Sequence, residues 1–135
     1  MSKIKSILLA AGLFCGLVWF GAAEAPAQGK VRVRFARNAS SATVKGRISG
    51  YRYIDYVVTA AAGQTMSVSV SSAGNFTQFV VFDRQMETLD DAAGVERWSG
   101  ELPESGAYTI RVLLPRAEAR RRTGAVDFAL TIAVR

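Results

Sequence analysis

Apolar and polar residues alternate along four stretches of the chain, a pattern typical of strands with one face buried. The clearest stretch is residues 65–71, TMSVSVS, in which Met66, Val68 and Val70 alternate with hydroxyl-bearing residues. The same period of two predicts three further strands with these inward residues: Val31, Val33 and Phe35 in 30–37; Tyr108, Ile110, Val112 and Leu114 in 107–114; and Phe128, Leu130, Ile132 and Val134 in 126–135.

Weaker strand patterns and turn signals fill the intervals between these segments. Further strands are expected at 42–49, 53–60, 76–83 and in a short piece near Trp98. Glycine-containing turn signals separate the strands at 61–64, 72–75, 92–94 and 104–106. About eight short strands, without a helical period, predict an all-β fold, a single-domain antiparallel β-sandwich, with a barrel as the other arrangement that this pattern allows.

The first 27 residues read as a secretory signal rather than as part of the fold. A short basic start is followed by the apolar run ILLAAGLFCGLVWFGAA and by the small residues APA before Gln28. We therefore expect cleavage before Gln28 and a domain formed by residues 28–135. The alternative is a retained membrane anchor, for which an apolar run of about 17 residues is short.

Arginine dominates the charge of the expected mature domain. The whole chain has 17 Lys and Arg against 11 Asp and Glu, a net charge of +6. Thirteen of the fifteen cations after residue 27 are arginines, whose planar fork suits carboxylates and phosphates. The excess of arginine favours an anionic partner, although a general bias in amino-acid composition would give the same excess. The only cysteine lies in the predicted signal, and an exported domain without disulfides suits the periplasm.

The expected mature domain lacks the residue types from which most catalytic sites are built. The expected mature domain has neither His nor Cys, so we expect no metal, no cofactor and no nucleophile–base pair of the common kinds. A glycosidase-like pair of carboxylates is conceivable among Asp90, Asp91, Glu101 and Glu104, but solvated turn residues explain them better. No motif indicates nucleic-acid binding, and after signal cleavage no segment indicates a membrane.

The segment PRAEARRRTG, residues 115–124, connects the last two predicted strands and holds four arginines. Pro115 fits the start of a short helix. In a helical turn over 116–122, Arg116 and Arg120 would project from the same face, and the other two arginines would point elsewhere. The alternative is a solvated loop in which Glu118 pairs with Arg121 or Arg122.

Two segments together resemble the periplasmic inhibitors of g-type lysozyme. Residues 102–120, LPESGAYTIRVLLPRAEAR, are similar to that family in the Ser-Gly-x-Tyr turn, the Arg-Val strand and the later Arg-x-x-Ala-Arg. Residues 40–71, with GYRY followed by a strand and a Gly-Gln turn, are similar to it as well. The match covers roughly three quarters of the expected mature chain in order and spacing, and it does not include residues 75–98.

The resemblance implies a β-sandwich that binds a g-type lysozyme and blocks its cleft, protecting the bacterial peptidoglycan. By position, the family's cleft-entering arginines fall on Arg116 and Arg120, its turn serine on Ser105 and its loop tyrosine on Tyr51. The chain departs from the family pattern at positions that bear on the choice of target lysozyme: Pro115, Arg121, Arg122, Arg52 and Ile54.

Simpler structural roles stand beside these expectations. Tyr51 could be a strand-end tyrosine covering the core, Ser105 a turn former capping its own loop, and Tyr108 has the inward parity of its strand. Arg122, unlike Arg116, is expected to matter little for binding. A non-catalytic module that binds glycan or an anionic envelope polymer through the same arginines remains the alternative function.

Overall fold

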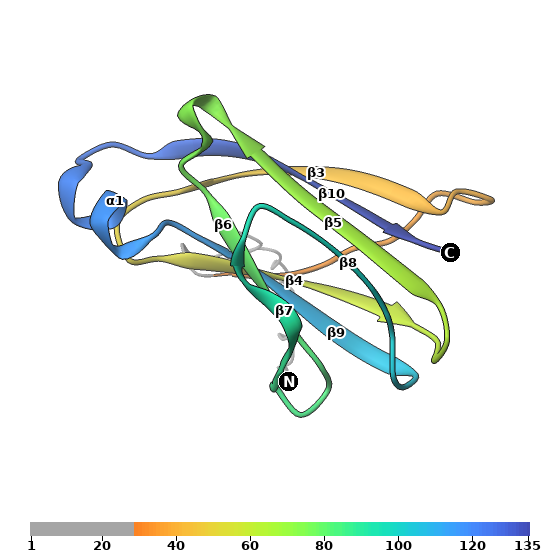
Figure 1. Ribbon diagram of the computed structural model, residues 1–135. Coiled ribbons are helices and arrows are strands. Elements are labelled where there is room, and N and C mark those ends of the chain that lie inside the picture. The colour runs from red at the N-terminus through yellow and green to blue at the C-terminus, as the bar shows by residue number, and fades with distance from the viewer. Residues whose placement is uncertain (1–28) are drawn as a thin grey trace, which may run out of the picture.

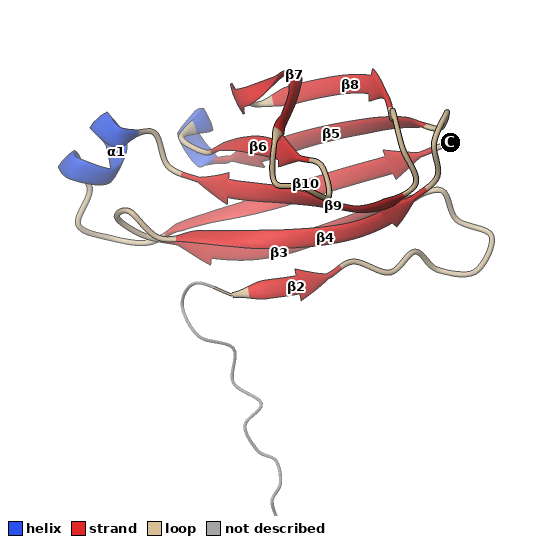
Figure 2. Ribbon diagram, turned by 90° about the horizontal axis from the view of Figure 1, so that it is seen from below, coloured by secondary structure: helices blue, strands red, loops and turns tan. Residues whose placement is uncertain are grey.

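The computed structural model describes residues 29–135, which form two β-sheets packed face to face (Figures 1 and 2). The predicted signal segment lies outside the described residues. Within 29–135 the elements are β2 (Lys30–Arg32), β3 (Ser41–Ile48), β4 (Tyr53–Ala60), β5 (Thr65–Ser72), the 3-10 turn η3 (Ala73–Asn75), β6 (Gln78–Phe82), β7 (Thr88–Val95), β8 (Arg97–Glu101), β9 (Gly106–Leu113), α1 (Arg116–Arg121) and β10 (Val126–Val134).

The strand order confirms the predicted β-sandwich. One sheet has the order β3-β10-β5-β8 and the other β2-β4-β9-β6-β7. Neighbouring strands in both sheets run antiparallel, except that β2 pairs with β4 in parallel. Because β9 is central in one sheet and β10 is an inner strand of the other, the connection between them crosses from one layer to the next.

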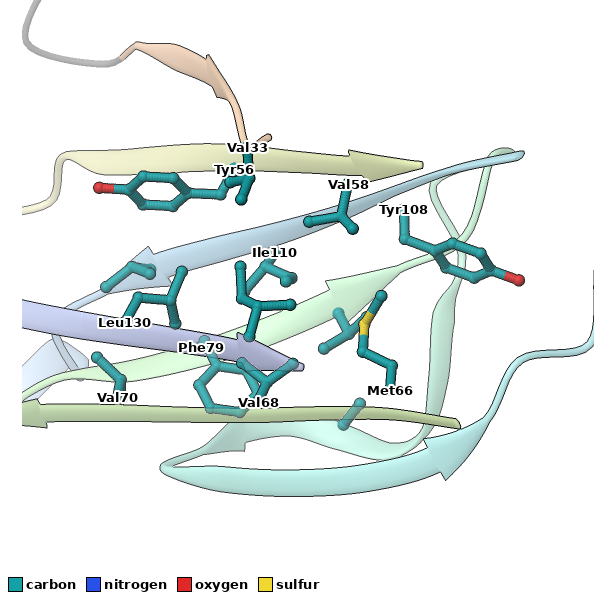
Figure 3. Packing of buried hydrophobic residues seen from close by; sticks show 14 of the residues in the cluster. Val33, Tyr56, Val58, Met66, Val68, Val70, Phe79, Tyr108, Ile110 and Leu130 are labelled. Atoms are coloured by element: carbon teal, nitrogen blue, oxygen red, sulfur yellow. The ribbon is translucent and has the colours of Figure 1, made fainter. Parts of the chain in front are cut away.

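Most of the residues that alternation placed inward form the core between the sheets (Figure 3). Leu130 and Ile132 of β10 are fully buried, as are Tyr108, Ile110 and Val112 of β9. Each fully buried aliphatic side chain contributes about 1.5–3 kcal/mol through the area it removes from water. Tyr108 also satisfies its hydroxyl, which donates to the Glu104 carbonyl and accepts from the Glu104 amide at 3.2 Å, so its assignment to the core is confirmed.

A glycine makes room for an aromatic contact within this core. The rings of Tyr56 and Phe128 meet edge to face with centroids 6.2 Å apart. Gly46 faces the core in the middle of β3, and a Cβ built there would come within 2.6 Å of the Phe128 ring. The absence of a side chain at this position is therefore a packing requirement.

The first strand is shorter than its sequence pattern suggested. Only Lys30–Arg32 are assigned to β2, although the Val33 amide still donates to the Val57 carbonyl at 2.9 Å. Val33 is buried as expected, whereas Val31 is 38% exposed because this edge strand is only partly covered by the opposite sheet. The prediction for Val31 was wrong.

Strand β7 was missed, and the turn predicted at residues 92–94 lies inside it. Asp91 and Gly94 both have positive φ, 61° and 65°, and the pairing with β6 shifts register twice. Irregularities of this kind are typical of bulged edge strands. They break the alternation on which the sequence prediction depended.

Candidate functional site

The connection between β9 and β10 folds into the six-residue helix α1. Pro115 begins it with φ −56°, and the Pro115 carbonyl accepts from the Ala119 amide at 2.9 Å. Ala119 is the buried residue of the helix, packed against the core cluster. The helix ends where Arg122 becomes extended while its amide still donates to the Glu118 carbonyl at 3.0 Å. The predicted short helix is thus confirmed.

Two of the four arginines in this connection are engaged within the chain. Glu118 accepts from Arg121 Nη2 and, at 3.2 Å, from Arg122 Nε. The Arg122 guanidinium also lies over the ring of Phe76, 3.6 Å from its centroid. The pairing of Glu118 that the sequence analysis attached to the alternative of a solvated loop therefore occurs with both arginines, but within a short helix.

Arg116 and Arg120 differ from these two. Both are exposed, and they stand four residues apart on one helix, the spacing that places side chains on a common face. Within residues 29–135 neither makes a side-chain hydrogen bond or an ion pair with another residue. The helix thus presents to solvent two guanidinium groups whose N–H donors bind no other side chain of residues 29–135.

The β3–β4 turn, which carries Tyr51, lies at the same end of the sandwich as α1 (Figure 1). Tyr51 sits in this turn, where Gly50 has φ 61° and the Arg52 amide donates to the Ser49 carbonyl at 3.2 Å. Its side chain is 66% exposed, so it does not cover the core. The placement follows from pairing, because β3 ends beside the start of β10 and β4 starts beside the end of β9.

Ser105 lies at the opposite end of the sandwich, immediately before β9. Its hydroxyl accepts from the Ala62 amide at 2.8 Å, so it caps the neighbouring β4–β5 turn rather than its own loop. The two turns are adjacent because Gly106 pairs with Ala60. A strand of eight residues, roughly 25 Å, separates Ser105 from α1. The structure therefore brings three of the four predicted site residues to one end and leaves Ser105 at the other.

Two other arginines toward this end of the sandwich are paired with carboxylates. Arg47, near the end of β3, donates to Asp127 Oδ1 at 2.7 Å, and this contact holds the pKa of the Asp127 carboxyl below its usual value. The guanidinium of Arg111 is bound by both carboxylate oxygens of Asp55 at 2.8 and 3.1 Å on the outer face of the five-stranded sheet. Arg47 and Arg111 are therefore less free than Arg116 and Arg120 to meet a partner.

Sequence reasoning missed Phe76, which belongs to the same end of the molecule. Phe76 follows η3 in the β5–β6 connection and is half-buried against the core. It contacts Arg122, a residue far along the chain. Phe76 lies at the start of a predicted strand, and nothing in the alternation of that segment signals the contact.

The four acidic residues considered for catalysis do not form one constellation. Asp90, Asp91 and Glu101 line a hollow of about 460 Å³ between β7 and β8, whereas Glu104 pairs with Arg84 at 3.0 Å. Asp90 and Asp91 lie on a strand rather than in the turn that the sequence suggested. Among residues 29–135, no group of His, Cys, Asp or Glu is arranged to hold a metal ion. No helix in this part of the chain is long and apolar enough to cross a membrane.

Comparison with known proteins identifies several relatives. The "Inhibitor of g-type lysozyme" of Escherichia coli (strain K12) is 37% identical over 128 residues, covering 88% of this chain and 90% of the relative. No protein-family model matches the chain.

Two solved structures share both the fold and the sequence similarity. Aeromonas hydrophila PliG, a periplasmic lysozyme inhibitor of g-type lysozyme, has a TM-score of 0.70 and 39% identity, covering 78% of this chain and 96% of its own. The corresponding PliG of Salmonella Typhimurium has a TM-score of 0.64 and 30% identity, covering 78% and 97%.

Proposed function

Because the chain belongs to the family of inhibitors of g-type lysozyme, we propose that it binds a g-type lysozyme in the periplasm and protects the peptidoglycan of the cell that exports it. The relatives are inhibitor proteins that act without catalysis, which confirms that this chain is not an enzyme. The predicted signal at residues 1–27 and the absence of cysteine from the rest of the chain fit a periplasmic location.

We further propose that α1 enters the cleft of the lysozyme through Arg116 and Arg120. The observation that carries this proposal is the contrast within the connection: Arg121 and Arg122 are bound by Glu118, whereas Arg116 and Arg120 are exposed without a partner in residues 29–135. Glycoside hydrolases cleave with carboxyl groups set in a cleft. A guanidinium can donate two parallel hydrogen bonds to such a carboxylate and occupy the space of the substrate.

Tyr51 is proposed as a second contact from the same end of the sandwich. Its ring is exposed and attached to a short turn, and a tyrosine anchors an interface with few rotatable bonds to immobilise. Ser105 lies at the other end of the sandwich from α1, and its hydroxyl already accepts from the Ala62 amide. The proposed inhibitory surface therefore consists of Arg116, Arg120 and Tyr51.

The test is the lysis of cell walls by g-, c- and i-type lysozymes with and without the purified protein. We expect near-stoichiometric inhibition of a g-type enzyme and largely unaffected c-type activity, because a shaped arginine surface fits one cleft. Equal inhibition of all three enzymes that disappears in moderate salt would contradict the proposal. That result would instead indicate a basic protein that coats the anionic wall.

A further inference from the structure

The helix that carries the proposed inhibitory arginines is too short to be stable by itself. Isolated helices need about 12–15 residues to be even marginally stable in water, and α1 has six. Its conformation must come from contacts with the rest of the chain. One of these is made by the buried Ala119, and another by Arg122 immediately after the helix.

Arg122 links the helix to a separate segment of the sandwich. Its Nε donates to Glu118 inside the helix, and its guanidinium covers the Phe76 ring in the β5–β6 connection. The Glu118 side chain is only 18% exposed and the Arg122 side chain 33%, so water screens this arrangement less than it screens a fully exposed pair. A guanidinium stacked on an aromatic face also holds a defined plane that an ammonium does not.

The Phe76 side of this contact is itself fixed by local structure. The Phe76 amide donates to Ser72 Oγ at 3.0 Å, and the buried Thr77 donates its hydroxyl to the same oxygen at 3.2 Å. Gly74 has φ 80°, and a Cβ at that position would collide with the Phe76 ring. Hydrogen bonds within the β5–β6 connection therefore fix the backbone that carries the ring, and Gly74 leaves room for the ring beside it.

We propose that Phe76, Arg122 and Glu118 form a clamp that positions Arg116 and Arg120 for binding. Arg122 is then a positioning residue, and this revises the sequence-based expectation that it matters little. The inference rests on the proposed function, because it assigns these residues a role in inhibition. Its physical basis is preorganisation: a helix held before binding avoids the entropy cost of ordering the connection in the complex.

The first test uses Phe76→Leu and Arg122→Lys, with Arg37→Ala as a control. Arg122→Lys keeps the charge but loses the stacked plane, and Arg37 is an exposed arginine in the β2–β3 connection at the opposite end. We expect inhibition about ten-fold weaker for both clamp variants and unchanged for the control. Trypsin should also cut residues 116–122 faster in the free clamp variants while the melting temperature of the domain stays close to wild type.

The second test is a double-mutant cycle. Its coupling between Phe76 and Arg120 would be absent if Phe76 only stabilised the fold. Arg120→Ala should weaken inhibition by a smaller factor in the Phe76→Leu background than in the wild type, since an unclamped helix no longer presents that arginine well. Equal factors in the two backgrounds, or faster cleavage with unchanged inhibition, would overturn the clamp.

The two proposals fail in different ways. If the wild-type protein inhibits no g-type lysozyme, the proposed function fails, while the trypsin measurement on the free protein still reports whether the clamp holds α1. If the wild type inhibits and Arg120→Ala weakens it, but neither clamp variant does, only the clamp is refuted.

Discussion

Truncation of Arg116 or Arg120 to Ala should weaken inhibition while leaving the stability of the domain nearly unchanged. Both side chains are exposed and make no ion pair within residues 29–135, so Ala at either position leaves no buried group unsatisfied. The free energy of unfolding should change by no more than about 0.5 kcal/mol, the usual effect of a surface substitution. Alanine also has the highest helix propensity, so α1 itself should not suffer.

The effect on inhibition should be much larger. In the proposed complex each guanidinium donates to a carboxylate in a water-poor cleft, and removing one partner of a desolvated charge pair costs about 2–5 kcal/mol. This corresponds to a roughly thirty-fold to several-thousand-fold rise in the dissociation constant. Arg→Lys at the same positions keeps the charge but loses the fork and should recover only part of the loss.

The assay is a titration of g-type lysozyme activity, run alongside thermal unfolding of the same variants. Arg37→Ala removes one positive charge at the opposite end of the sandwich and serves as the matched control. If Arg37→Ala weakens inhibition as much as Arg116→Ala and Arg120→Ala do, net charge rather than placed guanidinium groups is responsible, and the reasoning is refuted.

Three further predictions test the fold and the remaining contact. Gly46→Ala should overpack the core against Phe128 and destabilise the domain by about 1–3 kcal/mol, measured as a lower melting temperature; an unchanged value would contradict the packing argument. Asp55→Ala leaves the guanidinium of Arg111 without its carboxylate and should lower the free energy of unfolding by about 2–3 kcal/mol. Replacing both residues by Leu should restore stability in the same unfolding assay, and a double variant less stable than the single one would be evidence against this account. Tyr51→Ala should leave unfolding unchanged and weaken inhibition about ten-fold, so full inhibition by this variant would remove Tyr51 from the proposed surface.

The sequence predicted those parts of the fold in which local pattern and tertiary structure agree. Strands β5, β9 and β10 alternate strictly because one face of each is buried between the sheets, and their inward residues were identified correctly. Strand β7 was missed because bulges and residues with positive φ interrupt its alternation. The parallel pairing of β2 with β4 depends on the tertiary arrangement and leaves no local signal.

The candidate site was predictable to a similar extent. Pro115 and the spacing of Arg116 and Arg120 indicated the short helix and its exposed face. The contact between Arg122 and Phe76 joins two segments that only the folded sandwich brings together. The separation of Ser105 from α1 follows from strand direction, since a residue just before β9 and a helix just after β9 must lie at opposite ends.

Some positions of α1 contact the rest of the domain and others face solvent, and this difference bears on how the recognition specificity of the protein could be changed. The core and the clamp constrain positions 118, 119 and 122, Arg121 pairs with Glu118, and positions 116, 117 and 120 are exposed without an ion pair in residues 29–135. Positions 116 and 120 lie four residues apart on one face of the helix, and position 117 is exposed beside them. A library that varies only these exposed positions should yield variants of nearly constant stability. Such variants could differ in the lysozyme that they recognise, because the exposed residues can change while the rest of the sandwich stays the same.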